Sequence, residues 1–130
     1  MAFDFFDGLK VLDLGQGISG PFCAKLFADL GARVVKVETP TGDWARNMGP
    51  FPDDVPDAEK SGIYLALNTN KLGVTLNLET TRGRDLLLQL AEGADLLVEN
   101  YPPSYLPGIG LDFASLHARN RHPRPNLSPA

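Results

Sequence analysis

The sequence contains little cysteine, histidine and tryptophan, no long apolar run and no excess of basic residues. Its one cysteine, Cys23, excludes an internal disulfide framework and a cysteine-rich zinc site. No stretch approaches the roughly 18 apolar residues of a membrane-spanning helix. The N-terminal residues MAFDFFDGLK have no basic leader and no long apolar core, so we expect no signal peptide, no membrane partner and a cytoplasmic location.

The balance of charge argues against a nucleic-acid partner. Twelve basic and 16 acidic residues give a formal net charge of −4, which offers no electrostatic support for binding nucleic-acid phosphates. The two histidines, His117 and His122, have no metal-ligating neighbours, so no metal site is predicted. Apolar residues at 43% and charged residues at 22% are typical of a globular chain, and 13 glycines with 11 prolines predict many turns.

Strand-like and helix-like segments alternate along the chain. We predict strands at residues 10–14, 33–38, 74–78 and 95–99, and helices at 21–31, 80–92 and 113–119. Between them, 39–61 is predicted to be a long loop, and 63–67 is either a strand or a helical turn. This alternation favours an α/β fold with a parallel sheet. Because parallel sheets are covered on both faces, and two good helices cover little, we expect an incomplete domain or one that relies on a partner chain.

Several residues are assigned to helix ends and helix faces. Thr80 or Thr81 is predicted to begin the second long helix and Gly93 to end it, and Asp112 is predicted to cap the last one. Apolar residues at helical spacing predict the core-facing side of the first helix, namely Phe22, Leu26, Phe27 and Leu30. We expect Cys23 to lie in the core with them rather than to be a reactive thiol.

Residues 15–20, Gly-Gln-Gly-Ile-Ser-Gly, match the pattern G-x-G-x-x-G between a strand and a helix. With Glu38 at the end of the next strand, every element of the dinucleotide-binding fingerprint is present. The segment VLDLGQG also resembles the strand and loop that hold S-adenosylmethionine in Rossmann-type methyltransferases, again with Glu38 in the ribose-binding role. A third interpretation is a glycine-rich connection that binds no ligand, and the motif alone leaves all three open.

A longer ordered pattern extends from Gly8 to about Asn120. Its pieces are GLKVLDLGQGISGPFCAKLFADLGARVVKVE at 8–38, GDWAR at 42–46, MGPF at 48–51, NTNKLGVTLNLETTRGRDLLLQLAEGADLLVEN at 68–100 and the following YPPSYLPGIGL. In this order they resemble the N-terminal part of the family III CoA-transferases, which include formyl-CoA and carnitine CoA-transferases and have alpha-methylacyl-CoA racemases as relatives. Five pieces in family order are far more specific than the glycine motif alone.

The resemblance implies the incomplete N-terminal part of a Rossmann-like transferase domain over residues 1–118, followed by a divergent, disordered tail at 119–130. It implies CoA thioesters and carboxylic acids as substrates, no permanently bound cofactor, and a homodimer whose chains interlock. In the family an aspartate carboxylate attacks the acyl thioester, the CoA thiolate then opens the mixed anhydride, and the acceptor acid later takes the CoA. That aspartate lies downstream of the L-V-E-N strand in relatives, so we expect a truncated, inactive fragment and assign no catalytic residue.

The resemblance also implies which residues touch CoA. They come from three loops: Ile18 and Ser19; Leu76, Asn77 and Leu78; and Asn100, Tyr101 and Pro102. Loops that follow parallel strands are where open α/β sheets bind ligands, and backbone N–H groups near Ser19 suit a diphosphate. Thr39, Glu79 and Gly108 stand where some relatives carry basic residues, which leaves Arg46 and Lys71 as cations for the phosphates of CoA.

Two other functions stay open on the sequence alone. One is a Rossmann domain that binds S-adenosylmethionine or NAD. The other is a non-catalytic fragment that associates with a full-length homologue. The second follows from the exposed sheet edge expected after the fourth strand, since unpaired strand edges favour self-association.

Overall fold

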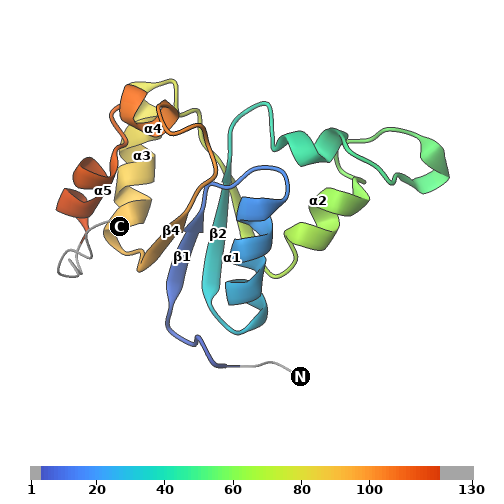
Figure 1. The fold of residues 1–130 in the computed structure, drawn as a ribbon, viewed down its shortest axis with the longest axis horizontal. Helices are drawn as coiled ribbons and strands as arrows, with labels where there is room; N and C mark the ends of the chain where they lie inside the picture. The colour runs from blue at the N-terminus through green and yellow to red at the C-terminus, as the bar shows by residue number, and fades with distance from the viewer. Residues whose placement is uncertain (1–3, 121–130) are drawn as a thin grey trace.

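The computed structural model describes residues 4–120, and its centre is a four-stranded parallel sheet (Figure 1). The strands are β1 (Lys10–Asp13), β2 (Arg33–Glu38), β3 (Leu72–Thr75) and β4 (Leu96–Val98), in the spatial order β3-β2-β1-β4. The register places Leu12 of β1 between Val35 of β2 and Leu97 of β4. The predicted α/β fold with a parallel sheet is confirmed.

Helices cover the two faces of the sheet. On one face lies α1 (Ser19–Asp29) with α2 (Gly62–Leu67) beside it, and on the other lie α3 (Thr81–Glu92) and α5 (Phe113–Arg119) (Figure 1). Successive strand residues point to opposite faces. Val11 therefore joins Ala24 in the core under α1, whereas Leu12 joins Leu87 in the core under α3. A short helix, α4 (Tyr105–Gly108), connects β4 to α5.

The side of α1 that faces the sheet differs from the prediction. The small residues Ala24 and Ala28 are buried there, whereas Phe22 and Leu26 are 49% and 48% exposed. Small side chains let the helix backbone approach the sheet closely, which leaves Phe22 and Leu26 on the outer surface, whereas Phe27 packs against the core as predicted. The expectation that Cys23 lies in the core is wrong for the same reason, since this residue is exposed.

Helix ends follow local hydrogen bonding, and most lie where the sequence predicts them. Thr80 caps α3 by accepting a hydrogen bond from the Gly83 N–H, and Gly93 ends that helix. Asp112 caps α5 in the same way. The undecided segment 63–67 is helical, because the Ser61 hydroxyl caps α2.

The strand predicted at 74–78 begins and ends earlier in the structure, as β3 at Leu72–Thr75. Leu76 still donates its N–H to the Glu38 carbonyl, but Leu78 turns into the core beneath α3. Residues 76–79 therefore lead from the end of β3 to Thr80, the N-cap of α3, on the face of the sheet that α3 covers.

The long loop predicted at 39–61 contains two short 3₁₀ turns, η1 (Trp44–Asn47) and η2 (Pro52–Asp54). The acidic residues Asp53, Asp54 and Glu59 lie exposed on its outer part, in agreement with a solvated loop. Of the tail predicted at 119–130, residues 121–130 lie outside the described residues.

Two ion pairs are buried beneath the loop that follows β1. The Lys36 Nζ lies 2.7 Å from Asp43 Oδ2 and 2.5 Å from the Gly15 carbonyl oxygen. The Lys71 Nζ lies 2.7 Å from Asp13 Oδ2. All four charged side chains are almost fully buried. Since a buried charge is costly without its partner, these pairs fix the loop against the strand ends.

Replacing Lys36 with Met is expected to destabilise the protein by about 3–5 kcal/mol, because it leaves the Asp43 carboxylate buried without its cation. The free energy of unfolding in urea measures this loss. Arg33→Met is the matched control, since Arg33 is an exposed residue of the same strand, and a change of at most about 0.5 kcal/mol is expected for it. Equal losses in the two variants would contradict a special role for the buried pair.

Candidate functional site

The site predicted from the loops lies where the strand order reverses. β1 leads through α1 to β2 on one side, and β4 lies on the other side of β1. Open α/β sheets bind ligands in the crevice outside the carboxyl ends of two such strands. The segments that leave β1 and β4 here contain Ile18 and Ser19, and Asn100 and Tyr101, respectively.

Hydrogen bonds join these two segments directly. The Gln16 N–H donates to Asn100 Oδ1 at 2.7 Å, and Asn100 Nδ2 donates to the Gln16 carbonyl at 2.7 Å and to the Ser19 hydroxyl at 3.1 Å. The Gln16 side chain donates to the Tyr101 hydroxyl at 2.8 Å. The structure thus brings Ser19, Asn100 and Tyr101 together around Gln16, a residue that the sequence did not single out.

Carboxylates of the protein accept hydrogen bonds from the backbone N–H groups of the glycine-rich loop. Asp13 Oδ1 accepts the Gly15 N–H, and Asp43 Oδ1 accepts the Gly17 N–H, both at 2.8 Å. Together with Gln16, three successive N–H groups of the loop therefore have acceptors inside the protein. Because a diphosphate would need these groups, the arrangement argues against the dinucleotide-binding interpretation of the motif.

The start of α1 is different. A helix leaves its first N–H groups without intrahelical acceptors, and here these belong to Ser19 and Gly20. Ile18 and Ser19 are exposed, so their surface is open to a ligand.

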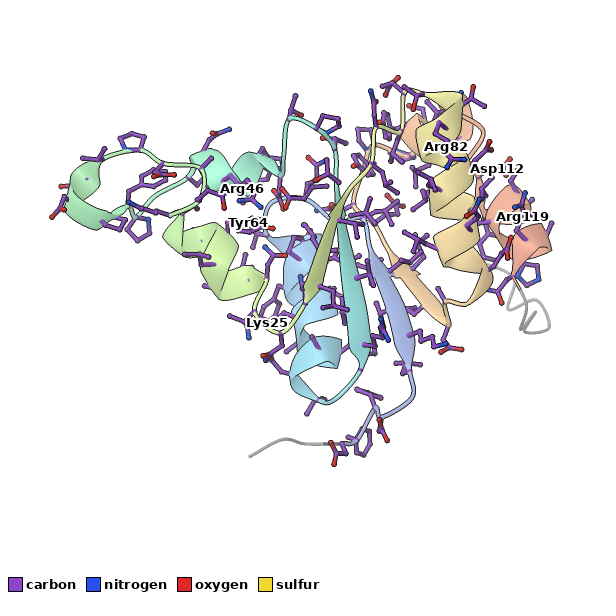
Figure 2. All side chains as sticks on the ribbon, turned by 180° about the vertical axis from the view of Figure 1, so that it is seen from behind. Lys25, Arg46, Tyr64, Arg82, Asp112 and Arg119 are labelled. Carbon is purple, nitrogen blue, oxygen red and sulfur yellow. The ribbon has the colours of Figure 1, made fainter. Side chains whose placement is uncertain are left out.

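Glu38, the candidate ribose ligand of both alternative interpretations, is fully engaged within the protein. Its carboxylate accepts two hydrogen bonds from Arg46 at 2.7 Å, one from the Tyr64 hydroxyl at 2.5 Å and one from the Asp43 N–H at 2.8 Å. The Arg46 guanidinium also lies over the Tyr64 ring, 3.8 Å from its centre, and Figure 2 shows the two side chains next to each other. No oxygen of Glu38 is left for a ribose hydroxyl.

The two cations expected to meet the phosphates of CoA are committed elsewhere. Arg46 is bound to Glu38, and the Lys71 ammonium contacts Asp13, the Pro21 carbonyl and Asn68 within 2.9 Å. Burial lowers the pKa of Lys71, and the bonds to Asp13 oppose this shift. Both cations therefore have carboxylate partners within the protein, and their contact with the phosphates of CoA stays a prediction.

The third predicted segment lies beside the other two. Leu78 as a whole residue is 1% exposed and belongs to the core, whereas Asn77 is exposed and Leu76 is partly buried. The next residue, Glu79, accepts a hydrogen bond from the Tyr105 hydroxyl at 3.0 Å. Tyr105 in turn packs on the Tyr101 ring, with 4.6 Å between their centres, which links this segment to the loop after β4.

Trp44, which the sequence pointed to only as part of the piece GDWAR at 42–46, lies against the glycine-rich loop. Gly17 has a φ of +75°, and a Cβ built on it would lie 1.9 Å from the Trp44 indole. The indole therefore rests directly on the loop, and Trp44 is 49% exposed. As the single tryptophan, placed in a long glycine- and proline-rich loop, it could have been singled out in the sequence. Pro102, the last predicted residue, is also exposed at the rim of the site.

Residues 4–120 contain no cluster of three histidine, cysteine or acidic side chains able to hold a metal ion. Within the same residues, no helix has the length and apolar character needed to cross a membrane.

The contacts of Glu38 predict a pH dependence of stability. Burial favours a higher pKa, but the hydrogen bonds from Arg46, Tyr64 and the Asp43 N–H outweigh it and lower the pKa of Glu38 from 4.5 to about 2. The stabilisation is therefore complete above the unfolded pKa and is lost as the pH falls from about 4.5 toward 2. We expect the urea midpoint to fall less steeply between pH 5 and pH 3 in Glu38→Gln than in the wild type.

Glu59→Gln is the matched control for this prediction, because the Glu59 side chain is 82% exposed. It should keep the steep wild-type fall of the urea midpoint. The same fall in Glu38→Gln as in the wild type would show that Glu38 is not responsible.

Comparison with known proteins extends over nearly the whole chain. The family model of CoA-transferase family III matches residues 6–123. Over 115 residues the chain is 43% identical to the succinyl-CoA:(R)-benzylsuccinate CoA-transferase subunit of Thauera aromatica, covering 88% of this chain and 28% of the relative. Over 112 residues it is 38% identical to the human succinyl-CoA:glutarate CoA-transferase, covering 85% of this chain and 24% of the relative.

Solved structures agree with this. A CAIB/BAIF family protein from Brucella suis superimposes with a TM-score of 0.80 at 35% identity, over 92% of this chain and 32% of that protein. The chain thus spans less than a third of the length of these relatives. The matched residues include both loops that meet at the switch point between β1 and β4. By the extent of the family match and the agreement of fold, the chain belongs to CoA-transferase family III.

Proposed function

We propose that this chain is the CoA-binding part of a family III CoA-transferase, that it binds acyl-CoA where β1 and β4 end, and that it does not transfer CoA by itself. The observation that carries the proposal is the set of hydrogen bonds among Gln16, Ser19, Asn100 and Tyr101 at the switch point of the sheet. These bonds hold the loops in place before any ligand arrives. Such preorganisation reduces the entropy lost on binding.

The side chains around this point match the parts of CoA. The N–H group of Ser19, an exposed residue at the start of α1, suits a phosphate or an amide of the pantetheine arm. Ile18 and Pro102 offer exposed apolar surface to the arm, and Asn77 offers a side-chain amide. The Trp44 indole is an aromatic surface of the kind on which an adenine ring stacks. Because Arg46 and Lys71 are engaged internally, the affinity for phosphates rests on backbone groups and is modest.

Three carboxylates near the loop after β1 are unsuited to the transfer reaction. Transfer requires a carboxylate oxygen to bond to the acyl carbon while the CoA thiolate leaves, which forms a mixed anhydride. Asp13, Glu38 and Asp43 are each paired with a buried or partly buried cation, which makes them poor nucleophiles. We therefore assign the nucleophile to none of these three residues.

Calorimetric titration with CoA, S-adenosylmethionine and NAD tests the proposal. We expect CoA to bind and the other two not to bind. Ser19→Ala removes the hydroxyl that accepts the Asn100 amide and so loosens the contact between the two loops, which should weaken CoA binding about 3- to 10-fold. Ser104→Ala is the matched control, because Ser104 is exposed and its side chain makes no capping bond in α4, and it should leave the affinity unchanged.

The same protein incubated with acyl-CoA donors and carboxylic acids should give no CoA transfer. Binding of S-adenosylmethionine or NAD without binding of CoA would overturn the assigned ligand. Clear CoA transfer by the purified chain would overturn the assigned lack of activity.

A second candidate function is association with a copy of the chain or with a full-length homologue. The homodimer implied by the resemblance is part of this candidate. One observation favours it: Ile18, Phe22 and Leu26 form a half-exposed apolar stripe along α1, four residues apart. Contiguous apolar surface of this kind marks interaction sites.

Light scattering at micromolar concentration tests the association. We expect the wild type to have twice the 14.1 kDa mass of one chain and Phe22→Asp to be monomeric, because a charge in an apolar interface is costly. Val55→Asp is the control, since Val55 is 62% exposed and lies in the loop at 39–61, outside α1, and it should remain dimeric. A monomeric wild type would contradict the homodimer.

A further inference from the structure

Glu38, which the glycine motif singled out as a ribose ligand, makes its contacts around a different residue. Its side chain lies at the end of β2, and its Oε2 accepts hydrogen bonds from the Asp43 N–H at 2.8 Å and from Arg46 Nε at 2.7 Å. These two donors belong to residues on either side of Trp44, the first residue of η1. One buried oxygen therefore holds both sides of the turn at 43–46 that carries the tryptophan.

Further hydrogen bonds fix the neighbours of the tryptophan in the interior. Asp43 Oδ1 accepts the N–H groups of Gly17 and Ala45, at 2.8 and 2.9 Å. The Ala45 carbonyl accepts the Ser61 hydroxyl at 2.8 Å. Asp43, Ala45 and Ser61 are each at most 1% exposed, whereas the tryptophan between the first two is 49% exposed. The turn thus buries its backbone and presents the indole at the surface.

The indole lies beside the residues that join the two halves of the CoA site. It rests on Gly17, whose missing side chain makes room for it, one residue along the chain from Gln16. Gln16 forms the hydrogen bonds to Asn100 and Tyr101 that connect the segments after β1 and β4. A half-exposed aromatic ring fixed in this place is a preorganised contact for a ligand.

We propose that Glu38 is a positioning residue that acts on the ligand through Trp44: its carboxylate sets the turn at 43–46 so that the indole stays on Gly17 and offers its exposed side to the adenine of CoA. This inference rests on the proposed function, since it gives a part in CoA binding to a residue that CoA does not touch. A ring on which a base stacks contributes roughly 5- to 100-fold in affinity.

The second oxygen of Glu38 allows positioning to be separated from stability. Oε1 accepts the Tyr64 hydroxyl of α2 at 2.5 Å and Arg46 Nη2 at 2.7 Å. Tyr64→Phe removes one bond to the carboxylate but leaves both bonds of Oε2 to the turn, and the ring remains under the Arg46 guanidinium. Glu38→Gln and Tyr64→Phe therefore both cost stability, but only the first loosens the turn.

Fluorescence of Trp44, the single tryptophan of the chain, reports the position of the indole without any ligand. In Glu38→Gln one oxygen becomes an amide nitrogen, which cannot accept an N–H group. We expect its emission maximum to move to longer wavelength and acrylamide to quench it more strongly than in the wild type. Glu38→Asp, whose carboxylate is one methylene shorter, should shift in the same direction and decides the question where Glu38→Gln does not fold. Tyr64→Phe should keep the wild-type emission.

Calorimetric titration with CoA tests whether Glu38 acts through the indole. Trp44→Ala should weaken CoA binding at least about fivefold, and Glu38→Gln should also weaken it. In the double variant the two losses should not add, and the affinity should equal that of Trp44→Ala alone, because without the indole Glu38 has nothing to position. Tyr64→Phe should bind CoA as the wild type does.

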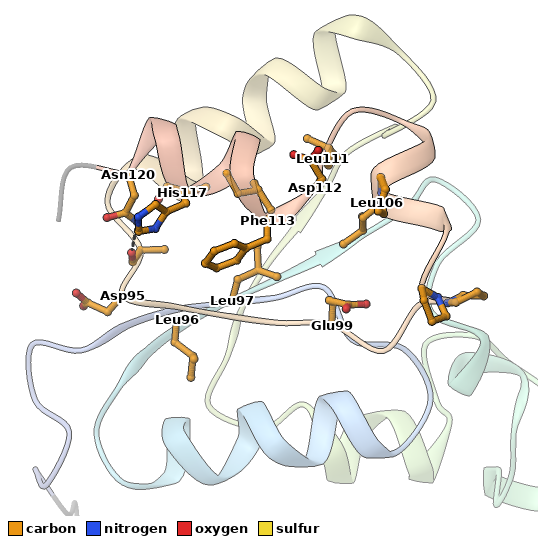
Figure 3. A pocket seen from close by; sticks show the side chains of 16 residues that line it. Asp95, Leu96, Leu97, Glu99, Leu106, Leu111, Asp112, Phe113, His117 and Asn120 are labelled. Carbon is orange, nitrogen blue, oxygen red and sulfur yellow. Dashed lines mark hydrogen bonds between the residues drawn. The ribbon is translucent and has the colours of Figure 1, made fainter. Parts of the chain in front are cut away.

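Phe113→Ala is the matched control for the loss of an exposed aromatic ring, since Phe113 is 71% exposed. Its ring lies at the wall of a cavity of about 540 Å³ between β4, α4 and α5, which is lined by residues between 91 and 120 and not by the turn at 43–46 (Figure 3). This variant should leave both the emission of Trp44 and the affinity for CoA unchanged.

Three results would overturn the proposal. They are an unchanged emission in Glu38→Gln, an equal shift in Tyr64→Phe, and additive losses of CoA affinity in the double variant. Absence of CoA binding by the wild type would instead overturn the proposed function, and the emission of the ligand-free variants would still decide whether Glu38 positions Trp44.

Discussion

The structure of the site depends on Lys36. This side chain leaves the middle of the sheet, bonds the Gly15 carbonyl and pairs with Asp43, whose other oxygen accepts the Gly17 N–H. One buried ammonium thereby ties β2, the glycine-rich loop and the start of η1 together. The Asp13–Lys71 pair repeats this arrangement at the end of β1. Since removing one member leaves an unpaired buried charge, the loop has little freedom to adopt another shape.

This network explains why a glycine pattern typical of dinucleotide binding serves a different purpose here. A Cβ on Gly15 would lie 2.7 Å from the Gly20 Cα, so the two glycines allow a close backbone contact within the loop. The N–H groups that a diphosphate would use are directed to carboxylates of the protein. The same residues that make the pattern thus create a rigid turn whose N–H groups are satisfied within the protein, whereas the first N–H groups of α1 have no intrahelical acceptor.

Local signals in the sequence predicted the fold better than they predicted the partners of charged residues. Strand positions, the caps Thr80 and Asp112 and the meeting of loops at the strand ends follow from periodicity and short-range hydrogen bonding. The ion pair of Lys71 cannot be predicted from such local signals, because its partner Asp13 is 58 residues away. The outer side of α1 was misassigned because apolar spacing does not reveal that alanines permit closer packing. Gln16, Trp44 and Tyr105 reach the site through contacts that only the folded chain defines.

Support for the two halves of the site is unequal. The loop after β1 is anchored by buried charges on two sides, whereas Asn100 and Tyr101 follow a strand of three residues that pairs, within residues 4–120, with β1 alone. Elements with fewer contacts open at lower free energy. The hydrogen bonds of Asn100 to Gln16 and Ser19 therefore matter most for the second half of the site, because they fix it to the better anchored loop.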